Sequence, residues 1–309
     1  MQDLLRKRVA LITGKGGVGR TSVTAALALV AQRAGKRVLV AEVWDGTEGA
    51  SPLAQLFGVP RLPRTAAPLA PGILGTQLRP DVGVELFLGQ VLRIARVARA
   101  ALDFEPLRRM FLAVPSLREL GIFFHLLSYL RATHERGEPA HQLILLDMPA
   151  TGHTLALTGL PEVVLRLIQR GPIAEALREG QSYMNSPEKT GAYVVTLPEE
   201  LPVSESLELL EGLERTSVPS GGLFVNRMPT TTFSPDEVAA VNAFLPGRSL
   251  FGTDGFHRAQ EAQRAVQRLA KSTSLPLVEL PTVESTGPAL AQELAERLQA
   301  ALLPAEGTR

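Results

Sequence analysis

The sequence predicts an α/β protein with a doubly wound, mostly parallel sheet and an inserted helical subdomain. Three observations indicate this class. Short, continuous apolar runs, typical of strands buried on both faces, alternate with stretches of helical periodicity. A glycine-rich loop follows the first apolar run and leads into the first helix. Two long helical regions, at about residues 85–138 and 160–190, interrupt the alternation on either side of one predicted strand.

The first strand–helix–strand unit lies within residues 8–43. RVALIT at residues 8–13 predicts a buried strand, and apolar residues at helical spacing follow the glycine loop until Gly35 ends the helix. RVLVAEV at residues 37–43 predicts the second strand, so the three elements form a right-handed βαβ unit. The Pro- and Ala-rich residues 59–72 predict an irregular surface connection.

Four later apolar runs predict four more strands, at residues 143–147, 192–197, 222–226 and 275–280. Ser234 begins a helix with the sequence Ser-Pro-Asp-Glu, which provides an N-cap, a first-turn proline and a capping-box glutamate. We therefore expect a single domain over residues 1–309, in which the two long helical regions form a subdomain rather than a separate domain.

Composition excludes several classes of function. The 309 residues are 45% hydrophobic and 20% charged, and their net charge of +1 gives no indication of nucleic-acid binding. The chain contains no cysteine, which excludes disulfides and thiolate metal sites. No secretory-type apolar stretch precedes the glycine loop, and the most apolar later segment is interrupted by Pro115, Arg118 and Glu119. We expect a cytoplasmic protein that is not itself transmembrane.

The loop GKGGVGRTS, residues 14–22, carries the strongest functional signal. It approaches the phosphate-binding pattern G-x-x-x-x-G-K-[ST], although Arg20 stands where lysine is usual and Lys15 lies near the start. Backbone N–H groups of such a loop turn toward a phosphate, and the following helix N-terminus adds positive potential. The predicted nucleotide contacts are Gly14, Lys15, Gly16, Gly17, Val18, Gly19, Arg20, Thr21 and Ser22.

An acidic residue, Asp147, ends the predicted strand at residues 143–147. Its position suits the aspartate that organises Mg²⁺ in phosphate-loop enzymes, and an aspartate that caps a turn is the alternative interpretation. Thr21 offers a hydroxyl to the same ion. We therefore predict ATP or ADP with Mg²⁺ as the ligands, and Thr21 and Asp147 as the metal ligands.

Two segments together resemble one family. The form G-K-G-G-V-G and the segment LILLDMPATGHTL, residues 143–155, resemble the ArsA-like ATPases. These are dimeric P-loop NTPases with a deviant Walker A loop, and they include arsenite-pump and tail-anchored-protein-targeting members. The second switch of the family typically reads D-T-A-P-T-G-H-T-L, from which Met148 and Ala150 depart mildly. Similarity extends from residue 9 to about residue 302.

The resemblance implies roles for individual residues. Lys15 corresponds to the lysine that reaches across the dimer to the nucleotide of the partner, and His153 lies in the second switch. Asn226 corresponds to the asparagine that meets the adenine base, with a plain turn residue as the alternative. The loop after the last predicted strand is similar to the family's adenine loop. The resemblance therefore implies that Pro281, Thr282 and Val283 lie next to the base.

Two positions depart from the family pattern. Arg20 keeps the positive charge of the usual lysine but is longer and planar, so we predict that nucleotide binding persists and hydrolysis is slowed. In the first switch, Trp44 stands where the family has a water-orienting aspartate, and Asp45 is displaced by one residue. Asp45 is the candidate for positioning the attacking water, and Lys15 and Asp147 are the other catalytic candidates.

The sequence leaves two functions open. One is a dimeric ATPase whose opening and closing is coupled to a partner or cargo, including a membrane protein, held by the helical subdomain. The other is a hydrolysis-impaired regulatory or structural subunit, so the dimer is either a homodimer or a heterodimer with an ArsA-like paralogue. A tail-anchor chaperone would need an apolar groove, but helical spacing favours the core for Leu120, Phe123, Phe124, Leu127 and Leu130. An arsenite role is not expected without cysteine.

Overall fold

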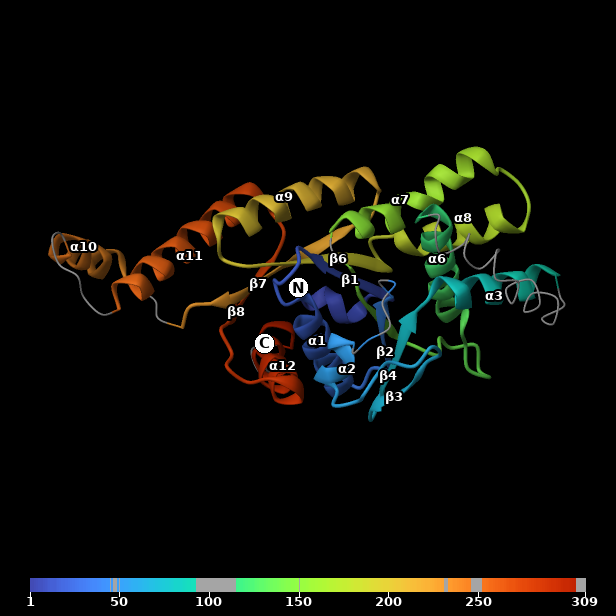
Figure 1. The fold of residues 1–309 in the computed structure, drawn as a ribbon, viewed down its shortest axis with the longest axis horizontal. Helices are drawn as coiled ribbons and strands as arrows, with labels where there is room; N and C mark the ends of the chain where they lie inside the picture. Colours follow the sequence, from blue (N-terminus) through green and yellow to red (C-terminus); the bar gives the residue numbers. More distant parts are fainter. Residues whose placement is uncertain are drawn as a thin grey trace, which may run out of the picture.

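The computed structural model describes residues 1–44, 46, 49, 51–92, 115–149, 151–230, 233–245 and 252–303. An eight-stranded sheet lies at its centre, with the strand order β3-β4-β2-β5-β1-β6-β7-β8. Every strand pair in this sheet is parallel except β3 with β4. Helices cover both faces of the sheet (Figure 1), which confirms the predicted fold class.

All six predicted strands are present, and their ends differ from the prediction by two residues at most. The strands are β1 (Val9–Gly14), β2 (Val38–Val43), β3 (Ala67–Ala70), β4 (Ile73–Leu78), β5 (Leu143–Asp147), β6 (Thr190–Thr196), β7 (Ser220–Met228) and β8 (Leu277–Pro281). The central strands β1, β5 and β6 are buried at every residue, as continuous apolar runs predict for a sheet covered on both faces.

The prediction for residues 59–72 was wrong in part. Its last residues form β3, which pairs antiparallel with β4 at the edge of the sheet, and β4 itself was not predicted. Pro68 is tolerated in β3 because an edge strand leaves one side of its backbone unpaired. β4 has the sequence ILGTQL and lacks the continuous apolar run of the central strands, so its periodicity gave little signal.

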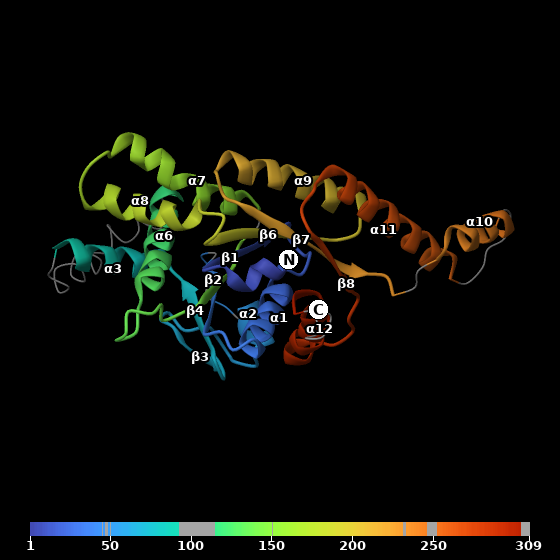
Figure 2. The ribbon, with the colours of Figure 1, turned by 180° about the vertical axis from the view of Figure 1, so that it is seen from behind.

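Two groups of helices cover the two faces. The helices are α1 (Arg20–Arg33), α2 (Pro52–Leu56), α3 (Pro80–Leu92), α6 (Pro115–Arg131), α7 (Thr151–Leu167), α8 (Pro172–Met184), α9 (Glu200–Arg215), α10 (Pro235–Phe244), α11 (Thr253–Ser272) and α12 (Gly287–Leu302), with a 3₁₀ helix η1 at Gln2–Arg6. One core contains residues of α1, α2 and α12, and the other contains residues of α6, α7, α8, α9 and α11. The same division is visible from behind in Figure 2.

Two predicted helix boundaries are confirmed. α1 begins at Arg20 directly after the glycine loop and ends at Arg33, two residues before Gly35. The helix after Ser234 has the predicted capping box, in which the Ser234 hydroxyl accepts the N–H of Glu237 and the Glu237 carboxylate accepts the N–H of Ser234. None of the helices in the described ranges is long and apolar enough to cross a bilayer.

Four helices, α3, α6, α7 and α8, gather at one end of the sheet (Figure 1), and we refer to them as the helical region. The apolar residues Phe123, Phe124, Leu127 and Leu130 of α6 are buried and Leu120 is half-buried, so the core interpretation of this segment is confirmed. α3 and α6 cross so closely that a Cβ on Gly83 would overlap the carbonyl oxygen of Gly121. Whether the helical region acts as a subdomain stays a prediction.

Substitution of Gly83 tests this close crossing. Gly83→Ala forces α3 away from the backbone of α6, and we expect the free energy of unfolding to fall by about 2 kcal/mol. The matched control is Gly89→Ala in the same helix, where a Cβ would meet nothing within 4 Å. This control gains helix propensity and is expected to raise stability by up to about 1 kcal/mol. Equal effects of the two variants in urea unfolding would contradict the crossing.

His125 makes stability depend on pH. It is buried on α6, where its Nδ1 accepts the N–H of Arg79 at 3.1 Å, and burial lowers its pKa from 6.5 to about 4. The unfolded chain therefore binds more protons than the folded chain between these values, and stability falls as the pH is lowered. We expect the burial of His125 to lower the free energy of unfolding by about 2 kcal/mol at pH 5 relative to pH 7. Urea unfolding at both pH values should show a smaller loss for His125→Asn than for wild type.

Candidate functional site

The glycine loop lies at the carboxyl end of β1, between the carboxyl ends of β5 and β6. Gly17 has a φ of 82° and Gly19 a φ of 92°, a region that favours glycine. A Cβ at Gly16 or Gly17 would meet nothing within 4 Å, so the backbone here forms an open cradle. A loop of this shape at the start of a helix presents N–H groups and positive potential to an anion.

Asn226 forms a hydrogen bond with the backbone of the glycine loop. It is buried near the end of β7, and its Nδ2 donates to the carbonyl oxygen of Val18 at 2.9 Å. The same amide occupies the space that a Cβ on Gly19 would need, so the loop closes over Asn226 only with glycine there. Sequence reasoning predicted that Asn226 contacts the adenine base, and that role stays a prediction. Its contact with the loop backbone was not predicted.

Thr21 and Asp147 are brought together as the sequence predicted for two ligands of one ion. The Thr21 hydroxyl donates to Oδ2 of Asp147 at 2.7 Å. Asp147 is buried, which raises its pKa to about 7, and the nearby carboxylate of Glu42 acts in the same direction. The hydrogen bond from Thr21 and the charge of Arg20 oppose this shift. The role of both residues as metal ligands stays a prediction.

Oδ1 of Asp147 is buried and has no hydrogen-bond partner in the described part of the chain. A buried carboxylate oxygen without a partner is costly, and a hard divalent cation satisfies it. The residues present therefore fit Mg²⁺, which Thr21 and Asp147 would hold beside the loop. The ion would supply positive charge to phosphate oxygens there.

Arg20 reaches past the loop. Its Nη1 donates to the backbone oxygen of Met148 at 2.7 Å, so the guanidinium links the start of α1 to the residue directly after β5. Burial lowers the pKa of Arg20, while the charge of Asp147 opposes that shift, and the group stays cationic. One of the five N–H donors of Arg20 is thus engaged with a protein carbonyl.

The second switch begins where β5 ends and leads into α7. Thr154 is buried in the first turn of α7, and its hydroxyl lies 3.0 Å from the hydroxyl of Thr13 at the end of β1. This pair ties the switch to the strand that carries the loop, and sequence reasoning did not single it out. The side chain of His153 lies outside the described part of the structure, so its role stays a prediction.

The first switch follows β2. Asp45, the predicted water-positioning residue, lies outside the described residues, and that role stays a prediction. Trp44 is buried, and its carbonyl oxygen accepts a hydrogen bond from Nη2 of Arg118 at 2.6 Å. The guanidinium carbons of Arg79 and Arg118 lie 4.1 and 5.5 Å from the centre of a Trp44 ring. Both distances are within the range of cation–π contacts, and the predicted correspondence of Trp44 to a water-orienting aspartate stays a prediction.

The remaining predicted residues lie at the same edge of the sheet. Pro281 ends β8, and the N–H of Thr282 donates to the carbonyl oxygen of Met228 at 2.9 Å, which joins the ends of β7 and β8. Val283 is half-buried against the core beneath α1 and α12. Lys15, at the exposed front of the loop, forms an ion pair with Glu205 of α9 at 2.8 Å. The predicted roles of these four residues at the nucleotide stay predictions.

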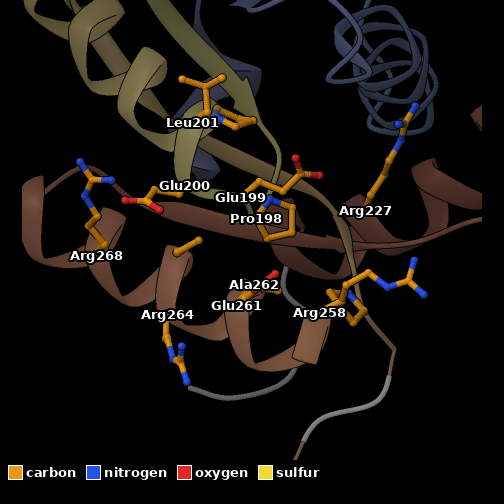
Figure 3. A pocket seen from close by; sticks show the side chains of 13 residues that line it. Pro198, Glu199, Glu200, Leu201, Arg227, Arg258, Glu261, Ala262, Arg264 and Arg268 are labelled. Atoms are coloured by element: carbon orange, nitrogen blue, oxygen red, sulfur yellow. The ribbon is translucent and has the colours of Figure 1, made fainter. Parts of the chain in front are cut away.

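A cavity of about 820 Å³ opens on the α9 side of this edge. Its lining comes from the turn before α9, the first turn of α9, the end of β7 with the residue after it, and one side of α11. Figure 3 shows that the guanidinium groups of Arg227, Arg258 and Arg264 point in different directions. These cations do not converge on one point, so the cavity does not resemble a phosphate site. The loop and Asp147 remain the candidate site.

Comparisons with known proteins find related sequences. Residues 7–179 match the family model described as anion-transporting ATPase. The chain is 30% identical over 237 residues to the ATPase BagA of Mycobacterium tuberculosis, across 75% of this chain and 68% of that protein. It is 34% identical over 168 residues to an uncharacterized protein of Streptomyces coelicolor, across 53% of this chain and 39% of that one. An arsenical pump-driving ATPase of Escherichia coli is 27% identical over 238 residues, 73% of this chain and 36% of that ATPase.

Asp147→Asn tests the cation site. The variant removes the charge while it keeps the shape of the side chain. We expect the factor by which Mg²⁺ increases ATP affinity to fall at least tenfold, which is about 1.4 kcal/mol. Titration of a fluorescent ATP analogue with Mg²⁺ and with EDTA measures this effect. In EDTA the variant is expected to bind at least as tightly as wild type, because a buried carboxylate no longer repels the phosphates. An undiminished Mg²⁺ effect in the variant would count against the site.

Proposed function

The chain belongs to the anion-transporting ATPase family, and from that membership we propose that it binds ATP with Mg²⁺ and hydrolyses it slowly as one subunit of a dimer. The observation that carries the proposal is the junction of the open loop with Thr21 and the unpartnered oxygen of Asp147. Closing and opening of the dimer would be coupled to a partner or cargo protein.

The reaction is a phosphoryl transfer to water. Water attacks the γ-phosphorus, the bond to the β–γ bridging oxygen breaks, and ADP and inorganic phosphate leave. Such reactions depend on positioning and on neutralisation of the charge on the transferred group. In this proposal the N–H groups of the loop bind the phosphates, Lys15 adds a cation to the nucleotide of the other subunit, and Asp45 orients the water.

Two departures support slow hydrolysis. Arg20 already donates to the carbonyl oxygen of Met148, so contact with a terminal phosphate requires it to leave that partner or to divide its donors. Trp44, with two guanidinium groups beside its ring, stands where the family resemblance predicts a water-orienting carboxylate. In this proposal each departure weakens stabilisation of the transition state, which lowers the rate of hydrolysis.

A second candidate function has one observation in its favour. The fixed position of Trp44 favours a nucleotide-binding subunit that does not hydrolyse ATP itself. Such a subunit would pair with an active paralogue and offer Lys15 to the nucleotide of that paralogue. The two candidates share ATP binding and differ in whether the purified chain turns ATP over.

We propose the helical region as the place where a partner or cargo, including a membrane protein, is held, and the cytoplasm as the place of action. Three exposed apolar side chains at the end of α7 support this assignment: Val163, Leu167 and Ile168, with 56%, 82% and 38% of their surface exposed. Apolar side chains grouped on a surface are typical of interaction sites. No nucleic-acid partner is part of the proposal.

Arg20→Lys tests the rate. A lysine is too short and compact to repeat the contact with Met148 and is free to meet a phosphate, so we expect steady-state ATPase activity to rise about tenfold, which is 1.4 kcal/mol of transition-state stabilisation. The matched control is Arg33→Lys, at the exposed end of the same helix, where the guanidinium contacts Gln292 and Gln299. The control is expected to leave the rate unchanged.

The same assay separates the candidate functions. A wild type that turns ATP over at a rate which Arg20→Lys does not improve would refute the attenuation argument. ATP binding without turnover in wild type and in Arg20→Lys would favour the second candidate. Purified protein that retains no ATP in the presence of Mg²⁺ would exclude both candidates.

A further inference from the structure

Lys15 has an ionic partner within its own chain. Its Nζ lies 2.8 Å from Oε1 of Glu205, and 50% of the lysine side chain is exposed against 22% of the glutamate. We propose that Glu205 is a positioning residue, which holds Lys15 on its own subunit without nucleotide and competes with the ATP of the opposite subunit for this cation. The inference rests on the proposed function, because it takes Lys15 to act across the dimer.

Glu205 stands on a rigid support. It lies on α9, whose neighbouring residues Val203 and Ser206 are buried, and the Ser206 hydroxyl donates to the carbonyl oxygen of Pro202. α9 follows β6, which pairs directly with β1. A Cβ on Gly14 would overlap the carbonyl oxygen of Val195, so the start of the loop and the end of β6 are pressed together.

Lys15 is the more exposed member of the pair. It lies between Gly14 and Gly16 at the exposed front of the loop, with a long side chain that has no other ion-pair partner in the described residues. One fixed carboxylate and one flexible cation form a contact that the lysine leaves without any movement of the backbone. Lys15 therefore pairs with whichever nearby group, Glu205 or a phosphate, carries the larger negative charge.

The competing charge is a triphosphate. An exposed ion pair contributes little, at most about a fivefold factor in an equilibrium constant, because water screens both groups. ATP offers several negative charges to the same ammonium in a site from which closure removes water. Lys15 therefore exchanges Glu205 for phosphate only when a nucleotide-loaded partner is opposite, and the ion pair opposes closure between subunits that carry no nucleotide.

Leu201 is an exposed apolar residue on the same surface as the ion pair. It lies one turn before Glu205 on α9, and 68% of its surface is exposed. An exposed leucine beside a half-exposed ion pair suits burial by a second subunit. Closure at this surface would cover Leu201 and remove Lys15 from Glu205 in one step.

Glu205→Gln tests the inference, with Glu208→Gln as the matched control. The two glutamates are three positions apart on α9, and Glu208 is exposed and has no ion-pair partner in the described part of the structure. Dimer formation is followed by sedimentation velocity against the concentration of a non-hydrolysable ATP analogue with Mg²⁺. We expect Glu205→Gln to lower the midpoint of dimerisation two- to fivefold, and Glu208→Gln to leave it unchanged.

A double-mutant cycle with Lys15→Ala separates positioning from a structural role. In the Lys15→Ala background, Glu205→Gln is expected to have no effect on the midpoint, and its melting temperature should match that of Glu208→Gln. An unchanged midpoint in Glu205→Gln, or an equal shift without Lys15, would overturn the inference while ATP-dependent dimerisation of wild type leaves the proposed function intact. A wild type that binds the analogue but does not dimerise, alone or with a paralogue, would overturn both.

Discussion

The parallel pairing of β1 with β5 and β6 is the constraint on which the candidate site depends. Because all three strands run in one direction, their carboxyl ends meet at one edge, and the polar residues that follow them are brought together. The glycine loop, Asp147 and the start of α9 reach this edge from parts of the chain that are far apart in sequence. The helices that cover both faces exclude water from the strands. The carboxylate of Asp147 therefore lies where desolvation disfavours its charged form.

The groups around the loop partly offset this desolvation cost of Asp147. Asp147 receives one hydrogen bond from Thr21 and the charge of Arg20 nearby, which together leave one oxygen without a partner. A lysine in place of Arg20 would reach less far. The arginine instead donates to the backbone after β5, so one side chain joins the start of α1 to the residue that follows β5.

The sequence predicted most of the fold and part of the site. Buried strands and the capped helix at Ser234 were readable because each depends on local periodicity or on residues close in sequence. The edge hairpin of β3 and β4 was not readable, because its pairing depends on a neighbour rather than on its own pattern. The contacts of Arg20 with Met148 and of Lys15 with Glu205 join distant segments, and composition and spacing carry no information about which carbonyl or carboxylate a long side chain will meet.

Trp44 is the only tryptophan among the 309 residues, and it lies at the end of β2 beside two guanidinium groups and a helix of the helical region. Indole emission responds to nearby charge and to water. Any rearrangement that moves the first switch away from Arg79 or Arg118 therefore changes the intrinsic fluorescence of the chain at a single, known position. The natural sequence thus contains a fluorescent reporter, without an attached dye, where the carboxyl end of β2 meets α6.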